Sequence, residues 1–247
     1  MKQDDTSARR AFLNHCTAVS AKLEHQSGDY LADHAERLYV TWRLCRRLGA
    51  EGRSFLSFGA GSAFVESALA ADGVDITIVD FPEAIMSNAA HYEACGLRTV
   101  AADVSKVSPG ALGQFDVVLA AEILEHVPMA PSQLIRAWSE PLRAGGRLIL
   151  STPNLGSVST LLRIIAMRPL LPEPERAFGP VSFENEGVHR REYMPSEINS
   201  AFLASGLRPE SITYSLNHRP RTLREHAFSA AQVIPRFRPT MILTAAK

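Results

Sequence analysis

The segment SFLSFGAGSAFVESALAADGVDITIVD, residues 54–80, decides the fold class of this 247-residue chain. It predicts a strand at Ser54–Phe58, a glycine turn, a helix from about Ser62 to Ala71 and a second strand at Asp75–Asp80. Glycines between a strand and a helix let the backbone come close to a ligand at the helix start. The turn Gly59-Ala60-Gly61 is therefore a predicted ligand-binding loop.

Strands and helices alternate on both sides of this segment. Helical periodicity fills residues 6–48, and a further helix opens at Pro82. A helix is also predicted from about Pro131 to Leu142, followed by the turn AGG, and another after a cap at Ser196. The remaining predicted strands are RTVAAD (98–103), FDVVLAAE (115–122), RLILST (147–152), SITYSL (211–216) and PTMILTAA (239–246). This order predicts an α/β fold with a largely parallel sheet and helices on both faces.

The N-terminal segment and one insertion stand outside this alternation. Residues 1–49 are predicted to form an N-terminal helical extension, and residues 50–247 the main domain. Within the latter, residues 155–188 hold four prolines, and together with Pro153 just before them these surround one apolar helical stretch, Val158–Met167. We interpret this segment as an inserted lid. A packed surface excursion is one alternative, and an interfacial helix is another, because LLRIIAMRPLL (161–171) carries two arginines among aliphatic residues.

Charge and cysteine content narrow the function classes. The formal net charge is zero, without the basic excess typical of nucleic-acid binding. Residues 1–142 carry a net charge of −6 and residues 143–247 a net charge of +6, which is either an uneven solvated surface or a surface for an anionic partner. Three widely spaced cysteines indicate neither a disulfide framework nor a zinc site. With a polar N-terminus and no apolar run of transmembrane length, we expect a soluble cytoplasmic protein.

Acidic residues recur where predicted strands end. Asp80 follows Gly59 by 21 residues, the place from which a carboxylate accepts hydrogen bonds from a ribose diol. Phe64 stands where a dinucleotide fingerprint needs a third glycine, so the ligand should lack a pyrophosphate. Asp103 suits an adenine amino group. A single aspartate is more often a turn or cap residue, but this repeated placement favours a nucleoside site.

Four motifs resemble those of the class I S-adenosylmethionine-dependent methyltransferases, over about residues 50–247. They are FLSFGAGSA, ITIVDFPEAI, VAADVS and FDVVLAAEILEHV, while LRAGGRLILSTPN resembles the segment around the fifth strand. HRREYMPSEINSAFLASGL is similar to a subgroup acting on small molecules, including sugar and polysaccharide-pathway enzymes and ubiquinone-biosynthesis O-methyltransferases. The resemblance implies a seven-stranded sheet with the last strand antiparallel, and S-adenosylmethionine as cofactor. The cofactor-binding residues it implies are Gly59, Ala60, Gly61, Asp80, Phe81, Asp103, Val104 and Ala121.

Two positions depart from the family pattern. Ser57 stands where the family usually has an acidic residue, and Ala63 where it often has glycine. In the family, that acidic residue helps to hold the first turn and the methionine end of the cofactor. A serine hydroxyl can still form a hydrogen bond there.

Methyl transfer is an in-line displacement, so an acceptor hydroxyl needs only orientation and a base or a metal to remove its proton. His126, at the carboxyl edge of the sheet, is the predicted base. If a helical turn follows the fourth strand, Glu122, Glu125 and His126 share one face. They then resemble the E-x-x-E-H element of the small-RNA 3′-terminal 2′-O-methyltransferases, in which a downstream histidine, here His189, completes a divalent-metal site. The set suits Mn²⁺, Fe²⁺ or Zn²⁺ at least as well as Mg²⁺. Alternatively, Glu122 faces the cofactor and His126 is a base or a packing residue.

The predicted function is methyl transfer to a small-molecule acceptor, a hydroxyl of a sugar or another polar metabolite. The basic second half and the lid favour an anionic acceptor. Two alternatives are methylation of an RNA end, which the neutral total charge disfavours, and a non-catalytic cofactor-binding partner subunit, for which Ser57 is the support.

Overall fold

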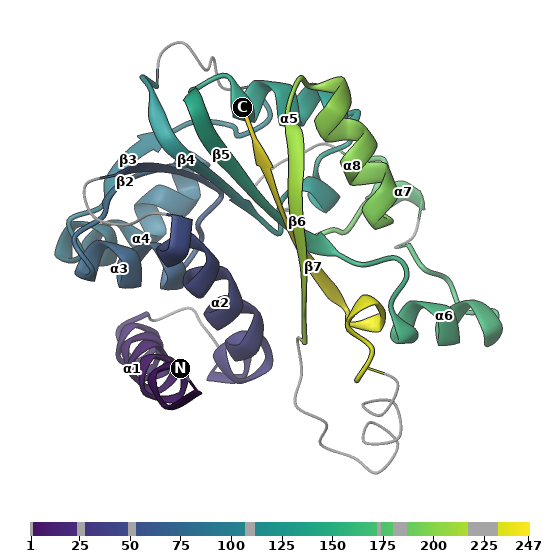
Figure 1. Cartoon of the computed structure of the whole chain (residues 1–247), viewed down its shortest axis with the longest axis horizontal. Helices are drawn as coiled ribbons and strands as arrows, with labels where there is room; N and C mark the ends of the chain where they lie inside the picture. The colour runs from purple at the N-terminus through teal and green to yellow at the C-terminus, as the bar shows by residue number, and fades with distance from the viewer. Residues whose placement is uncertain are drawn as a thin grey trace.

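One mixed sheet organises the chain (Figure 1). The computed structural model describes residues 2–23, 28–48, 53–106, 112–171, 174–179, 187–216 and 232–247. Within these ranges seven strands pair in the order β3-β2-β1-β4-β5-β7-β6. All neighbours from β3 to β5 are parallel, and β7 is antiparallel to both β5 and β6. The strands are β1 (Ser54–Phe58), β2 (Asp75–Asp80), β3 (Arg98–Ala101), β4 (Phe115–Ala121), β5 (Leu142–Pro153), β6 (Arg208–Ser215) and β7 (Thr240–Ala246). The predicted α/β class and the antiparallel last strand are confirmed.

Helices cover both faces of the sheet (Figure 1). One face carries α1 (Lys2–Ser20), α2 (Gly28–Leu48), α3 (Phe64–Ala71) and α4 (Pro82–Ala94). The other carries α5 (Pro131–Ser139) and α8 (Pro195–Ala204). Shorter elements are η2 (Leu124–His126), α6 (Val158–Ile165), α7 (Pro174–Ala177) and η4 (Pro235–Phe237). The sheet is thus the middle of three layers.

Strand alternation divides the apolar core into two halves. On β5, Leu148 and Leu150 pack with the α5 and α8 side, whereas Ile149 packs with the α1 to α3 side. By the same alternation, Ser151 and Thr152 direct their side chains to opposite faces at the carboxyl end of the strand. This separation governs the arrangement of the site described below.

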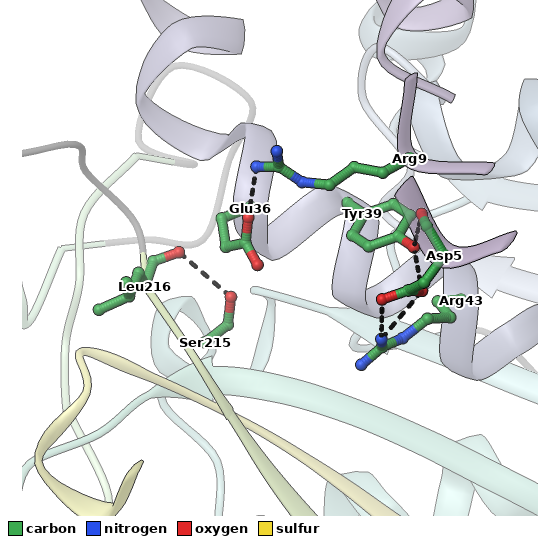
Figure 2. Close-up of polar contacts among 7 residues, drawn as sticks. All are labelled: Asp5, Arg9, Glu36, Tyr39, Arg43, Ser215 and Leu216. Carbon is green, nitrogen blue, oxygen red and sulfur yellow. Dashed lines mark hydrogen bonds and ion pairs between the residues drawn. The ribbon is translucent and has the colours of Figure 1, made fainter. Parts of the chain in front are cut away.

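Helices α1 and α2 form a pair that packs against helix α3 through apolar side chains. The ring of Phe12 stacks on Trp42 with centroids 5.0 Å apart, and Cys16 and Cys45 are fully buried. Figure 2 shows the polar contacts that join the two helices: Arg9 with Glu36, and Asp5 with Tyr39 and Arg43. Such exposed ion pairs contribute only about 0.2–1 kcal/mol each, so apolar burial holds the pair. Burial also raises the pKa of the Cys16 thiol to about 12, which keeps it protonated and unreactive at neutral pH.

Several predicted boundaries were wrong, and helix α5 ends at Ser139 rather than at about Leu142. Strand β5 begins at Leu142, so the AGG segment belongs to the strand rather than to a turn before it. Phe115 pairs with Leu142 and Val117 with Arg147, and this shift in register accommodates the extra residues of β5. Helix α8 begins after Met194 rather than at Ser196, because Pro195 occupies its first turn and the Glu197 carboxylate accepts the Met194 N–H at 2.8 Å.

The predicted lid, residues 155–188, is described except for residues 172–173 and 180–186, which lie outside the described residues. Its helix α6 ends at Ile165, two residues before the predicted end, and Met167 adopts a positive φ of 53°. Figure 1 shows α6 standing away from the sheet. Its side chains Ile164 and Ile165 are exposed. No helix in the described ranges is long and apolar enough to cross a membrane, and the expected cytoplasmic location stays a prediction.

Candidate functional site

A cavity of about 560 Å³ lies at the carboxyl ends of β1, β4 and β5. This is the edge at which ligands bind in open α/β sheets. Helix α2 forms one wall and α4 another. The lining residues are the turn 59–62, then Tyr30, Arg37, Leu38 and Thr41 of α2, Phe64, Val65 and Glu66 of α3, Ala84, Ser87 and Asn88 of α4, and Leu119, Ala121, Glu122 and Ser151 at the strand ends. The volume suits a small molecule of cofactor size.

The glycine turn brings its backbone into this cavity. Gly59 has a φ of +62°, and a Cβ there would lie 2.8 Å from Cδ1 of Ile123, so only glycine fits. Ala63, at the other end of the turn, keeps the left-handed conformation with a φ of 49°, although it carries a side chain. That strain costs on the order of 1 kcal/mol, and helix α3 begins directly after it.

Asp80 lies behind the turn and fixes it. One carboxylate oxygen accepts the Gly61 N–H at 3.1 Å, and the other accepts the Phe81 N–H at 2.8 Å. The side chain is buried, and burial raises the pKa of Asp80 although both hydrogen bonds lower it. Each oxygen has a second lone pair to offer a ligand. Asp80 therefore supports the loop, and its binding to a ribose stays a prediction.

The sequence-predicted cofactor residues divide into two groups. Gly59, Ala60, Gly61 and Ala121 line the cavity, whereas Asp80, Phe81, Asp103 and Val104 do not. The Asp103 carboxylate accepts hydrogen bonds from the backbone and hydroxyl of Ser105 and pairs with Lys106 at 2.8 Å. The Val104 carbonyl accepts the Trp138 indole N–H at 3.2 Å. A contact of Asp103 with adenine stays a prediction.

Helix α2 supplies a buried cation that the sequence analysis missed. Arg37 is 7% exposed, and its guanidinium lies 2.5 Å from the Glu122 carboxylate and donates to the Tyr30 hydroxyl at 3.1 Å. Among the described residues its Nε has no hydrogen-bond partner. One feature of the sequence could have indicated it. Arg37 shares a face of the helix with Leu38 and Thr41, and a charged side chain is rare on such a face.

A second group of polar side chains gathers next to Glu122. The candidate ligand atoms of Glu125, His126 and His189 all lie within 4.8 Å of one another. The Thr152 hydroxyl donates to Oε2 of Glu125 at 3.0 Å, while Oε1 is buried without a hydrogen-bond partner among the described residues. Burial, and then the nearby Glu122 carboxylate, raises the pKa of Glu125 well above its usual range. A buried carboxylate oxygen of this kind is usually satisfied by a hydrogen-bond donor or a bound ion, so Oε1 is available to such a partner.

His126 is oriented by the backbone at the end of the lid. Its Nδ1 lies 3.0 Å from the Val188 carbonyl oxygen, which can only accept, so Nδ1 carries the proton and Nε2 keeps a free lone pair. Nε2 lies 3.7 Å from Oε1 of Glu125, and the His189 ring meets the His126 ring edge-on at 4.8 Å. Burial lowers the pKa of His126 to about 4, which keeps the imidazole neutral at pH 7.

The prediction that Glu122 shares a helical face with Glu125 and His126 was wrong. The helical turn covers only Leu124–His126, and Glu122 precedes it with a positive φ of 56°. The Ser151 hydroxyl holds Glu122 at 2.7 Å on one face of the sheet, and Thr152 holds Glu125 on the other. Of the four predicted ligands, the structure thus brings together Glu125, His126 and His189, and directs Glu122 to Arg37.

Comparison with known proteins identifies the family. A family model described as a methyltransferase domain matches residues 56–150. A ubiquinone biosynthesis O-methyltransferase of Pseudomonas aeruginosa (strain UCBPP-PA14) is 30% identical over 192 residues, which cover 75% of this chain and 76% of the relative. The chain belongs to the class I S-adenosylmethionine-dependent methyltransferases. A second methyltransferase of the same description, from Bordetella avium (strain 197N), is 28% identical over 209 residues and is covered to 82%.

Solved structures share the methyltransferase fold. Magnesium protoporphyrin IX methyltransferase from Synechocystis PCC 6803 with bound SAH aligns with a TM-score of 0.61 at 17% identity, over 98% of this chain and 99% of that one. The [4+2]-cyclase SpnF aligns with a TM-score of 0.58 at 15% identity, over 86% and 81%. Because one of these folds is described as a cyclase, the shared fold alone does not determine the reaction of this methyltransferase.

Proposed function

We propose that this methyltransferase transfers the methyl group of S-adenosylmethionine to a hydroxyl group of a small polar molecule, such as a sugar or another metabolite. The observation that carries the proposal is the His126 imidazole at the carboxyl end of β4, whose Nδ1 is held by the Val188 carbonyl and whose Nε2 keeps a free lone pair, and whose lowered pKa keeps it neutral. A hydroxyl is a poor nucleophile until a base takes its proton, and this imidazole is in the correct protonation state to do so. The 30% identity to O-methyltransferases also supports an oxygen acceptor.

In this proposal the cofactor lies along the glycine turn. The backbone of Gly59, Ala60 and Gly61 comes close to the cofactor. The Asp80 carboxylate, behind this turn, accepts hydrogen bonds from the ribose hydroxyls. Arg37 supplies a guanidinium for the carboxylate of the methionine part, since its buried Nε has no partner among the described residues. Adenine then lies toward the ends of β2 and β3, where Phe81, Asp103 and Val104 follow the strands.

The chemical step needs little from the protein beyond orientation. Nε2 of His126 accepts the acceptor's hydroxyl proton while the oxygen attacks the methyl carbon in line with the carbon–sulfur bond. That bond breaks, its electron pair returns to sulfur, and the products are the methyl ether and S-adenosylhomocysteine. The ion pair of Glu122 with Arg37 forms part of the cavity lining.

As the alternative to His126 acting as a base, we propose that Glu125, His126 and His189 hold a divalent metal ion. The donor set fits, because Oε1 of Glu125 is unsatisfied and Nε2 of His126 is left as a lone-pair donor by the hydrogen bond at Nδ1, as in many metal-binding histidines. Glu122 does not fit, since Arg37 and Ser151 occupy its oxygens. Such an ion would lower the pKa of a bound hydroxyl and orient it.

Chelation separates the two proposed uses of His126. With a metal, exhaustive treatment with a chelator is expected to reduce turnover by at least about 100-fold, the usual size of a lost proton-transfer or Lewis-acid contribution, and Mn²⁺, Fe²⁺, Zn²⁺ or Mg²⁺ should restore it. Steady-state release of S-adenosylhomocysteine measures this. Turnover that survives chelation, with no rise in melting temperature on adding any of these ions, assigns His126 as the base and removes His189 from the site.

We also propose that residues 155–188 cover the acceptor. Val188 at its end holds His126, and the side chain of Arg190 donates to the His126 carbonyl at 2.8 Å, so this segment and the base are directly joined. Exposed apolar side chains on α6, Leu161, Ile164 and Ile165, are available for closure over a bound molecule. Arg163 in the same helix and Arg168 just after it suit an anionic acceptor.

A panel of acceptors tests the proposed function. Production of S-adenosylhomocysteine should depend on small hydroxyl compounds, represented by sugars, sugar nucleotides and phenols, and not on thiols, amines or RNA ends. Turnover on an RNA end would replace the small-molecule assignment. Cofactor binding without turnover on any class would indicate a non-catalytic subunit.

A further inference from the structure

The strand that precedes the glycine turn lacks its expected carboxylate. Ser57, on β1, occupies the position where the family usually has the acidic residue that helps to hold the methionine end of the cofactor. The Ser57 side chain is 2% exposed, and it carries a hydroxyl rather than a carboxylate. A carboxylate that serves this end of the cavity must therefore come from another element.

Helix α3 supplies such a carboxylate. The Ser57 hydroxyl donates a hydrogen bond to Oε1 of Glu66 at 2.6 Å. Glu66 lies in the first turn of α3, where the helix dipole favours a negative charge, and it lines the cavity. The strand and the helix together still present one hydroxyl and one carboxylate, with the carboxylate on the helix.

Glu66 has no compensating positive charge in the described part of the chain. It is 5% exposed, no basic side chain there pairs with it, and burial raises the pKa of its carboxyl while the Ser57 hydrogen bond lowers it. A buried carboxylate without a cation is costly unless a partner arrives with a ligand. The α-ammonium group of S-adenosylmethionine is such a cation.

We propose that Glu66, oriented by Ser57, binds the α-ammonium group of the cofactor's methionine part. The assignment rests on the proposed placement of S-adenosylmethionine in this cavity. Arg37 and Glu66 line the same cavity, so the amino-acid end of the cofactor meets one buried cation and one buried anion. In this chain the carboxylate at the amino-acid end of the cavity thus comes from α3, and β1 contributes the hydroxyl that orients it.

Two nucleosides test the assignment. S-adenosylhomocysteine carries the ammonium group, whereas 5′-methylthioadenosine has the same adenosine without the amino-acid part. In Glu66→Gln the affinity for S-adenosylhomocysteine should fall about 10- to 100-fold, as for other charge-assisted hydrogen bonds, while the affinity for methylthioadenosine stays within about two-fold. Glu83→Gln, an exposed glutamate in the first turn of α4, is the matched control and should change neither affinity.

An exchange variant keeps the test decisive if Glu66→Gln folds poorly. Ser57→Asp with Glu66→Ser returns the carboxylate to the strand and should bind S-adenosylhomocysteine within about three-fold of the wild type, since the charge stays at the same place. Wild-type affinity for S-adenosylhomocysteine in folded Glu66→Gln overturns the assignment, and so does an equal loss for both nucleosides. A wild-type protein that binds neither nucleoside overturns the proposed cofactor placement itself, and the assignment with it.

Discussion

Replacing Asp80 with alanine is expected to weaken S-adenosylmethionine binding by roughly 100-fold or more, because two charge-assisted hydrogen bonds to the ribose diol are lost. The carboxylate also accepts the N–H groups of Gly61 and Phe81, so the glycine turn loses its support at the same time. Titration calorimetry with S-adenosylhomocysteine measures the change.

Two further variants make this result specific. Asp75→Ala removes an exposed carboxylate at the opposite end of β2 and should leave the affinity unchanged. Asp80→Asn retains one acceptor oxygen and should fall between the wild type and alanine. Unchanged affinity in folded Asp80→Ala would falsify the ribose assignment, and with it the neighbouring roles of Phe81 and Asp103.

Replacing His126 with alanine is expected to lower turnover by about 10²- to 10⁴-fold, the usual contribution of a positioned proton acceptor. Affinity for S-adenosylhomocysteine should stay within about two-fold, because His126 does not line the cofactor cavity. Single-turnover measurements with an identified acceptor report the chemical step separately from binding.

The neighbouring histidine provides the matched control. The His189 ring contacts the His126 ring edge-on, and its side chain is exposed. If His126 acts as a base, His189→Ala should change turnover by no more than about five-fold; if both bind a metal, the two alanine variants should lose similar amounts. Normal turnover in His126→Ala would remove both mechanisms and leave His126 as a packing residue.

The parts of the site that follow directly from chain order could be predicted from the sequence. The glycine turn and Asp80 belong to one strand-helix-strand unit, in which a spacing of 21 residues fixes their meeting at one sheet edge. The order of strands and helices likewise determined the α/β class. Chain order is enough for these features, because the crossover between two parallel strands is almost always right-handed.

The parts that depend on which way a side chain leaves the backbone could not be predicted in the same way. A helical spacing placed Glu122 with Glu125 and His126, but the left-handed backbone at Glu122 and the alternation of Ser151 and Thr152 put the two carboxylates on opposite faces. Arg37 comes from α2, and nothing in its local pattern specifies contact with a residue 85 positions later. Long-range contacts of this kind arise only when the layers pack.

The hydrogen bond between Ser57 and Glu66 has a consequence for how substitutions at these two positions combine. Two acidic residues at these positions would place like charges in contact in a buried site, and two neutral residues would leave no anion there. Ser57 and Glu66 therefore act as one unit, and the effects of Ser57→Asp and Glu66→Ser on folding stability should not add: the double exchange should cost less than the sum of the two single changes.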